Sequence, residues 1–509
     1  MTILTFTAHW RSAQLLPVLL LFHGAAFGQN GNPLPLSGRP AGNGVVSSTQ
    51  TAIPGTTTSV NTLNPAIEVQ GPYAGSANSA EKLPFSGKLS LREAIQRGIA
   101  YNLGAIGLSQ AVREAHGQSR VARSALLPNL NSDLSEVVEQ VNLKALGVRI
   151  ASPVPGISIP SVVGPFNYFD LRARLSQTVA DLTAWNNYRA SIETVRANEF
   201  LSKDARDLVV LAVGGAYVQV IAAQARVTSA RAQLDTANAL FQQASERRAV
   251  GLLAQIDVNR SQVQVLTQQQ RLVSLQNDLA KQKINLARLT GLPPSDGFDL
   301  TDDIPFTPAP AITLEDALKQ ALDQRPDLKG AQAQVRAAER AVAAARAERF
   351  PSLTFGADYG AIGTNPAQSH GTFSVAGSLK IPIWQGGRTE GDIERADAVL
   401  VQRKAEASDT VSRIESDVRI AWLDLQAAAS QVEVAQRNRG VTQENLRLTR
   451  QRYEAGVTDN VEVVQSQDAV AAAELDYISS VFAHNVAKLS LARALGGAAD
   501  NVGRFLKLK

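Results

Sequence analysis

Apolar residues recur along much of the chain at alternating spacings of four and three positions, the period of an α-helix that buries one face. The clearest run extends from position 414 to position 435, and the same run is present 205 residues earlier. Such a heptad stripe packs against a neighbouring helix, so both stretches predict paired helices. The positions are Ile414, Val418, Ala421, Leu425, Ala428, Val432 and Ala435, and Val209, Val213, Ala216, Val220, Ala223, Val227 and Ala230.

The pattern predicts helices of two lengths. Residues 184–248 and 388–455 contain no proline, and each stretch of about 66 residues would form a helix about 100 Å long. Four shorter stretches of about 36 residues would each span about 54 Å, so two of them placed end to end match one long helix. We therefore predict long helices that pair with stacked half-length ones. The shorter stretches are residues 90–126, 256–290, 313–349 and 460–495.

Alternation with a period of two, which is typical of β-strands, separates the helices. Apolar and polar residues alternate in residues 353–359, 373–383 and 169–179, and more weakly in residues 129–138. Strands of about 10 residues with one apolar face can cross a membrane when tilted, with that face toward lipid. The sequence therefore predicts two membrane-crossing hairpins per chain.

Four strands cannot close a barrel, and an open sheet edge in lipid leaves backbone groups unpaired. Several chains must therefore share one barrel. Eight strands from two chains would have a filled interior, whereas twelve strands from three chains leave a lumen. We predict three chains.

Two tryptophans, Trp185 and Trp384, follow the second strand of each predicted hairpin. Tryptophan is enriched at membrane–water interfaces, so both are candidate interface anchors. The alternative is that each one packs in a helix seam at a helix start.

The chain contains a tandem duplication. Residues 89–95 and 124–130 have counterparts 223 residues later, whereas residues 250–291 have counterparts 205 residues later. The first copy is therefore longer by 18 residues, and the proline- and glycine-rich residues 152–164 are the expected place for this insertion. Each copy combines a helical hairpin with a two-stranded β-hairpin.

The N-terminal region predicts export. Arg11 precedes an apolar run at residues 15–22, and the small-residue sequence Ala26-Phe27-Gly28 is typical of a signal-peptide cleavage site. The run is shorter than the roughly 20 apolar residues of a membrane-spanning helix. We expect no later helix to be long and apolar enough either, so any membrane crossing is expected to use strands. Residues 29–86 are rich in Gly, Ser, Thr, Asn and Pro, and are expected to form a flexible leader.

Composition argues against several kinds of site. The formal net charge of +4 is small and spread along 509 residues, so it does not predict binding of nucleic acid. The chain has no Cys, which rules out disulfides, thiolate metal sites, a Cys nucleophile and an acylated N-terminal Cys. The five His residues are scattered, and no metalloprotease, phosphate-loop or serine-hydrolase motif is present. We therefore predict no enzyme, no cofactor and no metal site.

Over about residues 89–497 the order and spacing of these segments resemble the TolC-type outer-membrane efflux proteins. No single motif is specific, but the duplicated order is. The matching segments are the helix starts at residues 91–94 and 314–317, the strand entries at Pro128 and Pro351, the turns at residues 248–252 and 453–457, and the Ala-Leu-Gly sequence that ends at Gly496.

The resemblance implies a mixed α and membrane-β fold. A homotrimer would form a long α-helical barrel, the tunnel, continuous with a 12-stranded β-barrel to which each chain gives four strands. It also implies a passive outer-membrane exit duct, with a periplasmic extension, in a tripartite efflux or type I secretion system that conducts small molecules or polypeptides. The implied partners are a periplasmic adaptor (membrane fusion protein), an inner-membrane pump and outer-membrane lipid.

The resemblance places two glycine turns at the far tip of the tunnel. There the adaptor helices would dock. The residues concerned are Gly251 and Leu252 in the first copy, and Tyr453, Gly456 and Val457 in the second.

The resemblance also implies that acidic residues after each turn narrow the tip. The matching positions are Asp257 and Glu462, while Gln465 replaces a second acidic residue that is common in the family. Asp459 and Arg452 would belong to the same network. Clustered carboxylates in a narrow mouth attract cations and can hold a gate closed. The alternative is that each acid is a solvated residue near a helix N-terminus, favoured by the helix dipole.

A periplasmic adaptor or a structural coiled-coil protein is the main alternative function. Adaptors usually carry one hairpin between small β-domains, whereas this chain has two hairpins in each repeat, one helical and one of β-strands. The predicted parts are residues 1–28 (signal peptide), 29–86 (leader), 87–291 (first repeat, with its β-hairpin at about 129–180), 292–312 (equatorial linker), 313–497 (second repeat, with its β-hairpin at about 352–384) and 498–509 (short tail).

Overall fold

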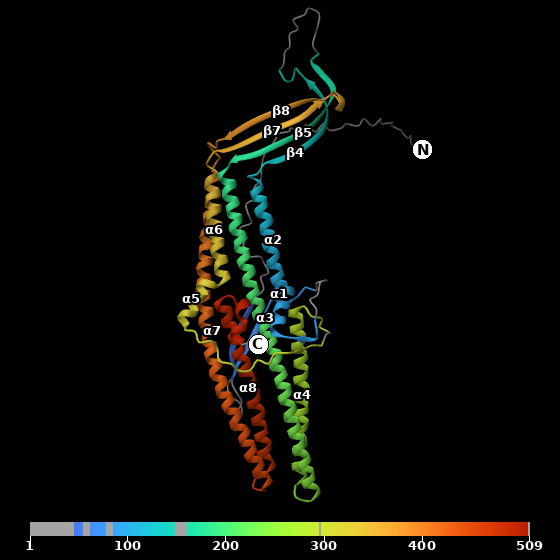
Figure 1. Ribbon diagram of the computed structural model, residues 1–509, viewed down its shortest axis with the longest axis vertical. Helices are drawn as coiled ribbons and strands as arrows, with labels where there is room; N and C mark the ends of the chain where they lie inside the picture. The colour runs from blue at the N-terminus through green and yellow to red at the C-terminus, as the bar shows by residue number, and fades with distance from the viewer. Residues whose placement is uncertain (1–44, 54–61, 78–84, 148–159, 295–296, 507–509) are drawn as a thin grey trace, which may run out of the picture. The chain divides into compact units, whose positions relative to one another are not determined.

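The computed structural model describes residues 45–53, 62–77, 85–147, 160–294 and 297–506. All of them belong to the unit Arg39–Lys509 (Figure 1). The expected signal peptide lies outside the described residues, as do much of the expected leader and most of the expected insertion at residues 152–164.

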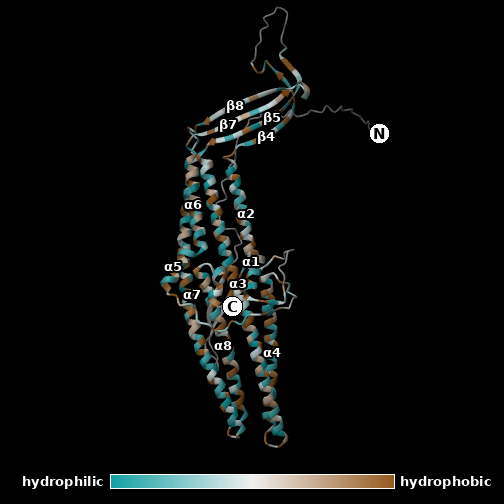
Figure 2. Cartoon of the chain, in the orientation of Figure 1, coloured by the Kyte–Doolittle hydropathy of each residue, from teal (hydrophilic) through white to brown (hydrophobic). Residues whose placement is uncertain are grey.

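Two long helices are present in the described part of the chain. α3 (Leu182–Ala249) has 68 residues and α7 (Arg388–Glu454) has 67, which confirms the two long helices predicted from the periodicity. The apolar heptad positions of both helices are buried, except that Ala216 is half-buried. In Figure 2 the helices alternate between hydrophilic and hydrophobic colours along their length, as expected for helices with one buried stripe.

The half-length helices are of two kinds. α4 (Gln255–Thr290) and α8 (Asn460–Leu495) are continuous and have 36 residues each. The other two predicted stretches are each split in two, so the prediction of four continuous helices was wrong for these. They form α1 (Leu91–Tyr101) and α2 (Leu103–Ser124), and α5 (Leu314–Gln324) and α6 (Pro326–Ala347).

Each break has a local cause. Asn102 is extended between α1 and α2, where its side chain accepts a hydrogen bond from Gly104 N (2.9 Å) and donates one to Tyr73 O (2.7 Å). Pro326 disfavours a helical conformation at Arg325 and has no N–H with which to continue α5. Both breaks therefore follow from residues with special backbone demands.

The long helices pack against successive shorter ones. α3 contacts α2 and α4 on one side and α6 and α8 on the other, while α7 contacts α6 and α8 (Figure 1). This arrangement confirms the predicted pairing of each long helix with stacked half-length helices.

One antiparallel sheet holds both β-hairpins. β4 (Asn129–Asn142), β5 (Val162–Ala180), β7 (Ser352–Gly363) and β8 (His370–Lys380) lie in the order β4-β5-β7-β8. Within the described residues, β4 and β8 each pair with one strand only, so they are the edges of the sheet. The strands of the first hairpin have 14 and 19 residues against 12 and 11 in the second, so part of the excess length of the first copy lies in longer strands.

Part of the expected flexible leader is ordered, which is a correction. β1 (Val46–Ile53) pairs with β2 (Thr62–Val69) and is followed by η1 (Gly71–Ala74). Ile67 lies directly on Gly215 of α3, where a Cβ would be 1.8 Å from Ile67 Cδ1. Composition misses this contact because the apolar surface that receives this segment belongs to helices distant in the sequence.

The linker between the copies contacts elements of both. β6 (Asp299–Leu300) pairs in parallel with β3 (Lys88–Leu89), and Thr307 Oγ1 accepts a hydrogen bond from Lys488 Nζ of α8 (2.8 Å). In the region expected as a short tail, α9 (Ala498–Leu506) packs against α3 and α8. The main hydrophobic core lies where the two copies, the linker and α9 meet.

One helix contradicts the expectation that no later segment is long and apolar enough to span a membrane. α3 meets that test by length and composition, because residues 208–225 contain no charged residue. However, 67% of its apolar window is buried inside the protein. We therefore interpret this stretch as part of the core, since apolar sequence alone does not distinguish lipid from a protein interior.

Candidate functional site

The two helix ends at the predicted tip form the same turn. Gly251 and Gly456 follow α3 and α7 with φ values of 77° and 71°, a left-handed conformation that glycine adopts without steric cost. After each glycine, the N–H of Leu252 or Val457 donates a 2.9 Å hydrogen bond to the carbonyl five residues earlier, a common way to terminate a helix. A Cβ at either glycine would meet nothing within 4 Å, so backbone conformation rather than lack of space requires glycine.

The turns expose apolar side chains but bury the tyrosine. Leu252 and Val457 are 76% and 68% exposed. Tyr453 is buried, and the Arg247 guanidinium of α3 lies 4.8 Å from its ring centroid. Tyr453 therefore links the end of α7 to the end of α3 and contributes little to the exposed surface of the turn.

Asp257 lies in the first turn of α4, beside the start of α8. Its side chain pairs with Arg260 (3.2 Å), and its backbone O accepts hydrogen bonds from Asn460 Nδ2 (3.2 Å) and Ser261 Oγ (3.0 Å). Asn460 also donates to Ser261 Oγ (2.9 Å). Asn460, Ser261 and Arg260 were not predicted from the sequence. The one signal available was that Ser261 has a serine counterpart 205 residues later.

Glu462, Asp459 and Arg452 lie close together where α7 ends and α8 begins. Glu462 forms an ion pair with Arg452 (3.2 Å), and both side chains are about half exposed. Asp459 Oδ1 caps α8 by accepting hydrogen bonds from Val461 N (3.1 Å) and Glu462 N (3.2 Å). Gln465 is exposed on the same helix. This cluster forms within one copy of the repeat, and Asp257 belongs to a separate set of contacts.

The predicted interface tryptophans lie where the sheet meets the helices. Trp185, in the first turn of α3, is 47% exposed and has its ring centroid 6.3 Å from that of Tyr188. Trp384 lies between β8 and α7 and is 87% exposed, next to the almost fully exposed Ile383. Of the two, Trp384 is the more exposed.

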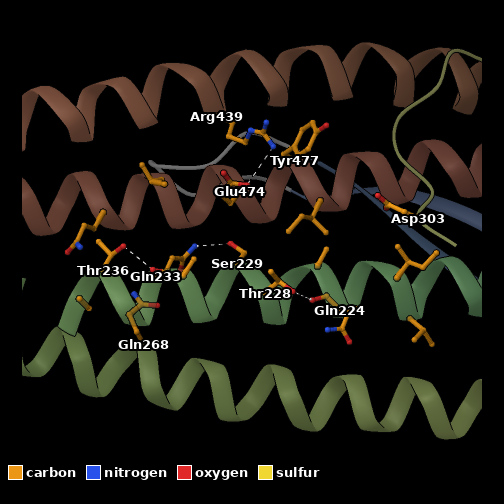
Figure 3. Close-up of a pocket in the computed structure, with 18 of the residues that line it drawn as sticks. Gln224, Thr228, Ser229, Gln233, Thr236, Gln268, Asp303, Arg439, Glu474 and Tyr477 are labelled. Atoms are coloured by element: carbon orange, nitrogen blue, oxygen red, sulfur yellow. Dashed lines mark hydrogen bonds and ion pairs between the residues drawn. The ribbon is translucent and has the colours of Figure 1, made fainter. Parts of the chain in front are cut away.

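A groove of about 930 Å³ lies between the α3–α4 pair and the α7–α8 pair (Figure 3). Arg439 of α7 lies 4.2 Å from the ring centroid of Tyr477 and 3.8 Å from Glu474, both on α8. The remaining lining mixes apolar and uncharged polar side chains, and it also includes the charged residues Lys283, Asp299, Asp302 and Asp303. Its amides and hydroxyls include Gln224, Thr228, Ser229, Gln233, Thr236, Gln264, Gln268 and Gln467.

A mostly buried charge cluster joins α3, α6, α7 and α8 near the break at Arg325. Arg493 of α8 pairs with Asp204 of α3 (2.5 Å), and Arg325 pairs with Asp327 (2.7 Å) and with Asp417 of α7 (2.9 Å). Burial raises the pKa of Asp204 to about 6, against the opposing effect of Arg493. The cluster therefore holds one carboxyl whose charge depends on pH near neutrality.

Among the residues that the structure describes, no group of three or more His, Cys, Asp or Glu side chains is placed to hold a metal ion. Near the tip, Asp257 and Glu462 are paired with arginines, and Asp459 caps α8.

Comparison with known proteins gives consistent results. The family model described as "Outer membrane efflux protein" matches residues 108–292 and 317–497. The chain is 27% identical over 401 residues to the pyoverdine export outer membrane protein OpmQ of Pseudomonas aeruginosa, covering 76% of this chain and 80% of that protein. It is also 27% identical over 414 residues to the outer membrane protein OprJ of the same organism, covering 78% and 81%.

Solved structures show the same fold. The crystal structure of a membrane protein from Pseudomonas aeruginosa matches with a TM-score of 0.70 at 19% identity, covering 84% of this chain and 92% of that one. The outer membrane protein VceC from Vibrio cholerae matches with a TM-score of 0.66 at 19% identity, covering 80% and 96%. At this level of identity the structural likeness establishes the fold alone.

Proposed function

The chain belongs to the outer membrane efflux protein family, and we propose that three copies of it form one exit duct across the outer membrane. Its relatives are outer-membrane components of efflux pumps, which implies a periplasmic adaptor and an inner-membrane pump as partners. The family consists of channel proteins rather than enzymes. The chain is therefore an outer-membrane exit duct whose transport is driven by its partners.

The observation that carries the trimer proposal is the four-stranded sheet. One of its faces presents large exposed apolar side chains, including Leu134, Tyr359 and Phe373. Its strands of 11 to 19 residues are long enough to cross the hydrocarbon core when tilted. The edge strands β4 and β8 would leave backbone groups unpaired in lipid, and a further copy of the sheet supplies their partner. Twelve strands from three copies close a barrel that has a lumen.

Two exposed apolar stripes on the helices support the same assembly. In one chain α4 packs on α3, α3 on α8 and α8 on α7, so α4 and α7 are the outer helices of this series. We propose that the α7 stripe of each copy packs against the α4 stripe of the next. Such a head-to-tail contact closes into a ring when the rotation fits. The stripes are Ile420, Val434, Val441 and Leu448 on α7, and Ile256, Val263, Leu266 and Val273 on α4.

At the tip, we propose that Asp257 and Glu462 form acidic rings around the axis of the trimer. The exposed Arg452–Glu462 pair contributes at most about 1 kcal/mol, so a cation or another helix can displace it. Gln465 lies about one turn further along α8 and adds a neutral amide instead of a second charge. The rings would attract cations to a narrow mouth.

We propose that the exposed turns at Leu252 and Val457 dock the periplasmic adaptor. Both present an apolar side chain on a rigid helix end, and both lie beside the proposed acidic rings. Trp185 and Trp384 would anchor the base of the barrel in the headgroup region, where an amphipathic ring is favoured.

The test is the assembly state of the mature protein. We expect it in the outer-membrane fraction as a detergent-requiring, heat-modifiable trimer that conducts ions in planar bilayers. Val441→Asp should dissociate the trimer by placing a charge in the α7 stripe. Gln436→Asp adds the same charge at an exposed polar position of α7 and should leave the trimer intact.

The main alternative makes the opposite prediction. A periplasmic adaptor or a structural coiled-coil protein would be soluble without detergent. A mature chain that is soluble and monomeric would therefore exclude the exit duct.

A further inference from the structure

The face of the sheet opposite the apolar one carries a lattice of ion pairs. Arg172 of β5 lies between Asp170 of the same strand (3.3 Å) and Asp358 of β7 (2.7 Å). Arg174 of β5 pairs with Asp133 of β4 (2.9 Å). We name these five residues the charged belt, because the strand register places them at one level of the sheet. They join the three adjacent strands β4, β5 and β7 (Figure 1) and both copies of the duplication.

The strand register places all five members on one face. Asp133 lies opposite Arg172, and Arg174 lies opposite Asp358, and residues directly opposite in a sheet share a face. The ion pairs between strands run diagonally to this register, so each arginine bonds a carboxylate two residues along the neighbouring strand from its own opposite residue. Gly360, which lies opposite Arg172, has no side chain, and a Cβ there would come within 3.1 Å of Arg172 Cβ. The glycine therefore leaves room for the arginine to lie across the strands.

We infer that the charged belt is an ion-selectivity filter in the lumen of the β-barrel, separate from the constriction at the tunnel tip. This inference rests on the proposed function, because the polar face lines a lumen only when several copies close the barrel. Rings of charged side chains in a pore select ions by sign. The belt has three carboxylates and two guanidiniums, so each chain contributes one net negative charge. The filter therefore favours cations.

The ion pairs fix the charges in position. The side chains of Arg172, Asp170 and Asp358 are only 18–22% exposed, whereas those of Arg174 and Asp133 are more than half exposed. The first three form an anchored centre, and the last two present their charges to water. Two further charged residues on this face, Glu139 and Lys380, lie near opposite ends of the strands and have opposite sign. They leave the net charge of the face unchanged.

The test is the reversal potential of the full-length protein in planar bilayers under a KCl gradient. The wild type should be more permeable to K⁺ than to Cl⁻. Asp133→Asn combined with Asp358→Asn makes the belt net positive, so the K⁺/Cl⁻ permeability ratio should fall from above one to below one. Arg174→Gln should raise the ratio. Each variant is measured with the native tip and with Asp257→Ala and Glu462→Ala, because the tip carries charges of its own.

Two controls separate charge from structure. Glu136→Gln removes the same charge from β4 on the opposite face, where Glu136 lies opposite Phe169, and should leave the ratio unchanged. Exchanging Asp133→Arg with Arg174→Asp keeps both the pair and the net charge, and should also keep the wild-type ratio. Assembly of each variant is checked by its heat-modifiable mobility.

The outcomes are distinguishable. If the double asparagine variant does not assemble, the permeability ratio of Arg174→Gln decides the question. The Arg174 side chain is mostly exposed, so its replacement should not prevent assembly. If the variants assemble and conduct, but their K⁺/Cl⁻ permeability ratio is unchanged with both the native and the substituted tip, the proposed selectivity filter is wrong. The proposed exit duct would not be affected by that result. A wild-type protein without any conductance would instead overturn the proposed function.

Discussion

Asn460 Nδ2 lies 2.9 Å from Ser261 Oγ, so the start of α8 is hydrogen-bonded to the start of α4. The same amide donates to the backbone O of Asp257 (3.2 Å), and Asn460 is 4% exposed. This contact joins the two copies of the repeat at the tip, between Asp257 and the Glu462 cluster. It is a direct physical link through which the two helical hairpins hold each other in place.

Asn460→Ala should loosen this link. It leaves the buried Ser261 Oγ without the donor from Asn460, which costs about 1–3 kcal/mol, whereas Asp257 O keeps its hydrogen bond from Ser261 Oγ. We expect a lower melting temperature and a larger conductance of the assembled protein in planar bilayers. Gln262→Ala, which removes an exposed amide next to Ser261, is the matched control and should change neither property. A trimer that melts earlier but conducts as before would show that the link is structural and does not gate.

Asp257→Ala combined with Glu462→Ala should raise the conductance and weaken block by divalent cations. Both changes remove carboxylates from the proposed rings, and a ring without charge attracts fewer cations. The measurement is single-channel current with and without a divalent cation. Glu454→Ala removes an exposed acidic residue from the adjacent turn and should preserve both the conductance and the block. Unchanged conductance in the double variant would remove these residues from the gate.

Asp204 makes the stability of the protein depend on pH. Burial raises its pKa to about 6, above its ordinary value of 3.8. Because the pKa of Asp204 is higher in the folded state, the folded protein binds this proton more tightly than the unfolded chain does. The protonated carboxyl therefore contributes stability that is complete below about pH 4 and is lost as the pH rises to about 6 and beyond. Arg493, Arg325, Asp327, Asp207 and Tyr73 face the carboxyl and set its surroundings.

Asp204→Asn removes this titration. The melting temperature of the variant relative to wild type should therefore rise between about pH 4.5 and about pH 7. Asp299→Asn changes a side chain that is 91% exposed, so the difference between its melting temperature and that of the wild type should not vary across the same pH range. A difference between Asp204→Asn and wild type that does not vary with pH would argue against a raised pKa.

Gly215→Ala should displace the β1–β2 hairpin from α3. The added Cβ would lie 1.8 Å from Ile67 Cδ1, and overpacking of this kind costs about 1–3 kcal/mol. We expect a lower melting temperature and faster proteolysis within residues 45–77, with partial recovery when Ile67→Ala is added. Gly117→Ala in α2 is the matched control, because a Cβ there meets nothing within 4 Å. It should be neutral or stabilise by about 0.5–1 kcal/mol. Equal effects of both changes would mean that Ile67 does not fill the space above Gly215.

Much of the fold was predictable because helical and strand periodicity are local properties of the chain. The spacing from Ile414 to Ala435 and its counterpart 205 residues earlier predicted α7 and α3, and the structure confirms both. The glycines at 251 and 456 marked the ends of these helices, since their positive φ is a demand of the backbone itself. The break at Arg325 was also encoded locally, by Pro326, although the pattern of apolar residues runs through it.

Local pattern failed where an element depends on a distant surface. The strands β1 and β2 have too few apolar residues to form a core of their own, yet they form a hairpin that packs on α3, because Gly215 leaves space for Ile67. Residues 208–225 have the apolarity of a membrane span and are buried in protein instead. The role of Asn102 likewise depends on Tyr73, which lies 29 residues earlier in the chain.

By itself, the sequence determined the duplication, the lengths of the long helices and the two-faced strands, because each follows from the spacing of apolar residues along one segment. Only the tertiary structure decided which polar residues meet: Asn460 with Ser261, Glu462 with Arg452, and Arg172 with Asp358. Hydrogen bonds and ion pairs require atoms within about 3 Å of each other, and the spacing of residues within one segment does not record which distant segment supplies the partner.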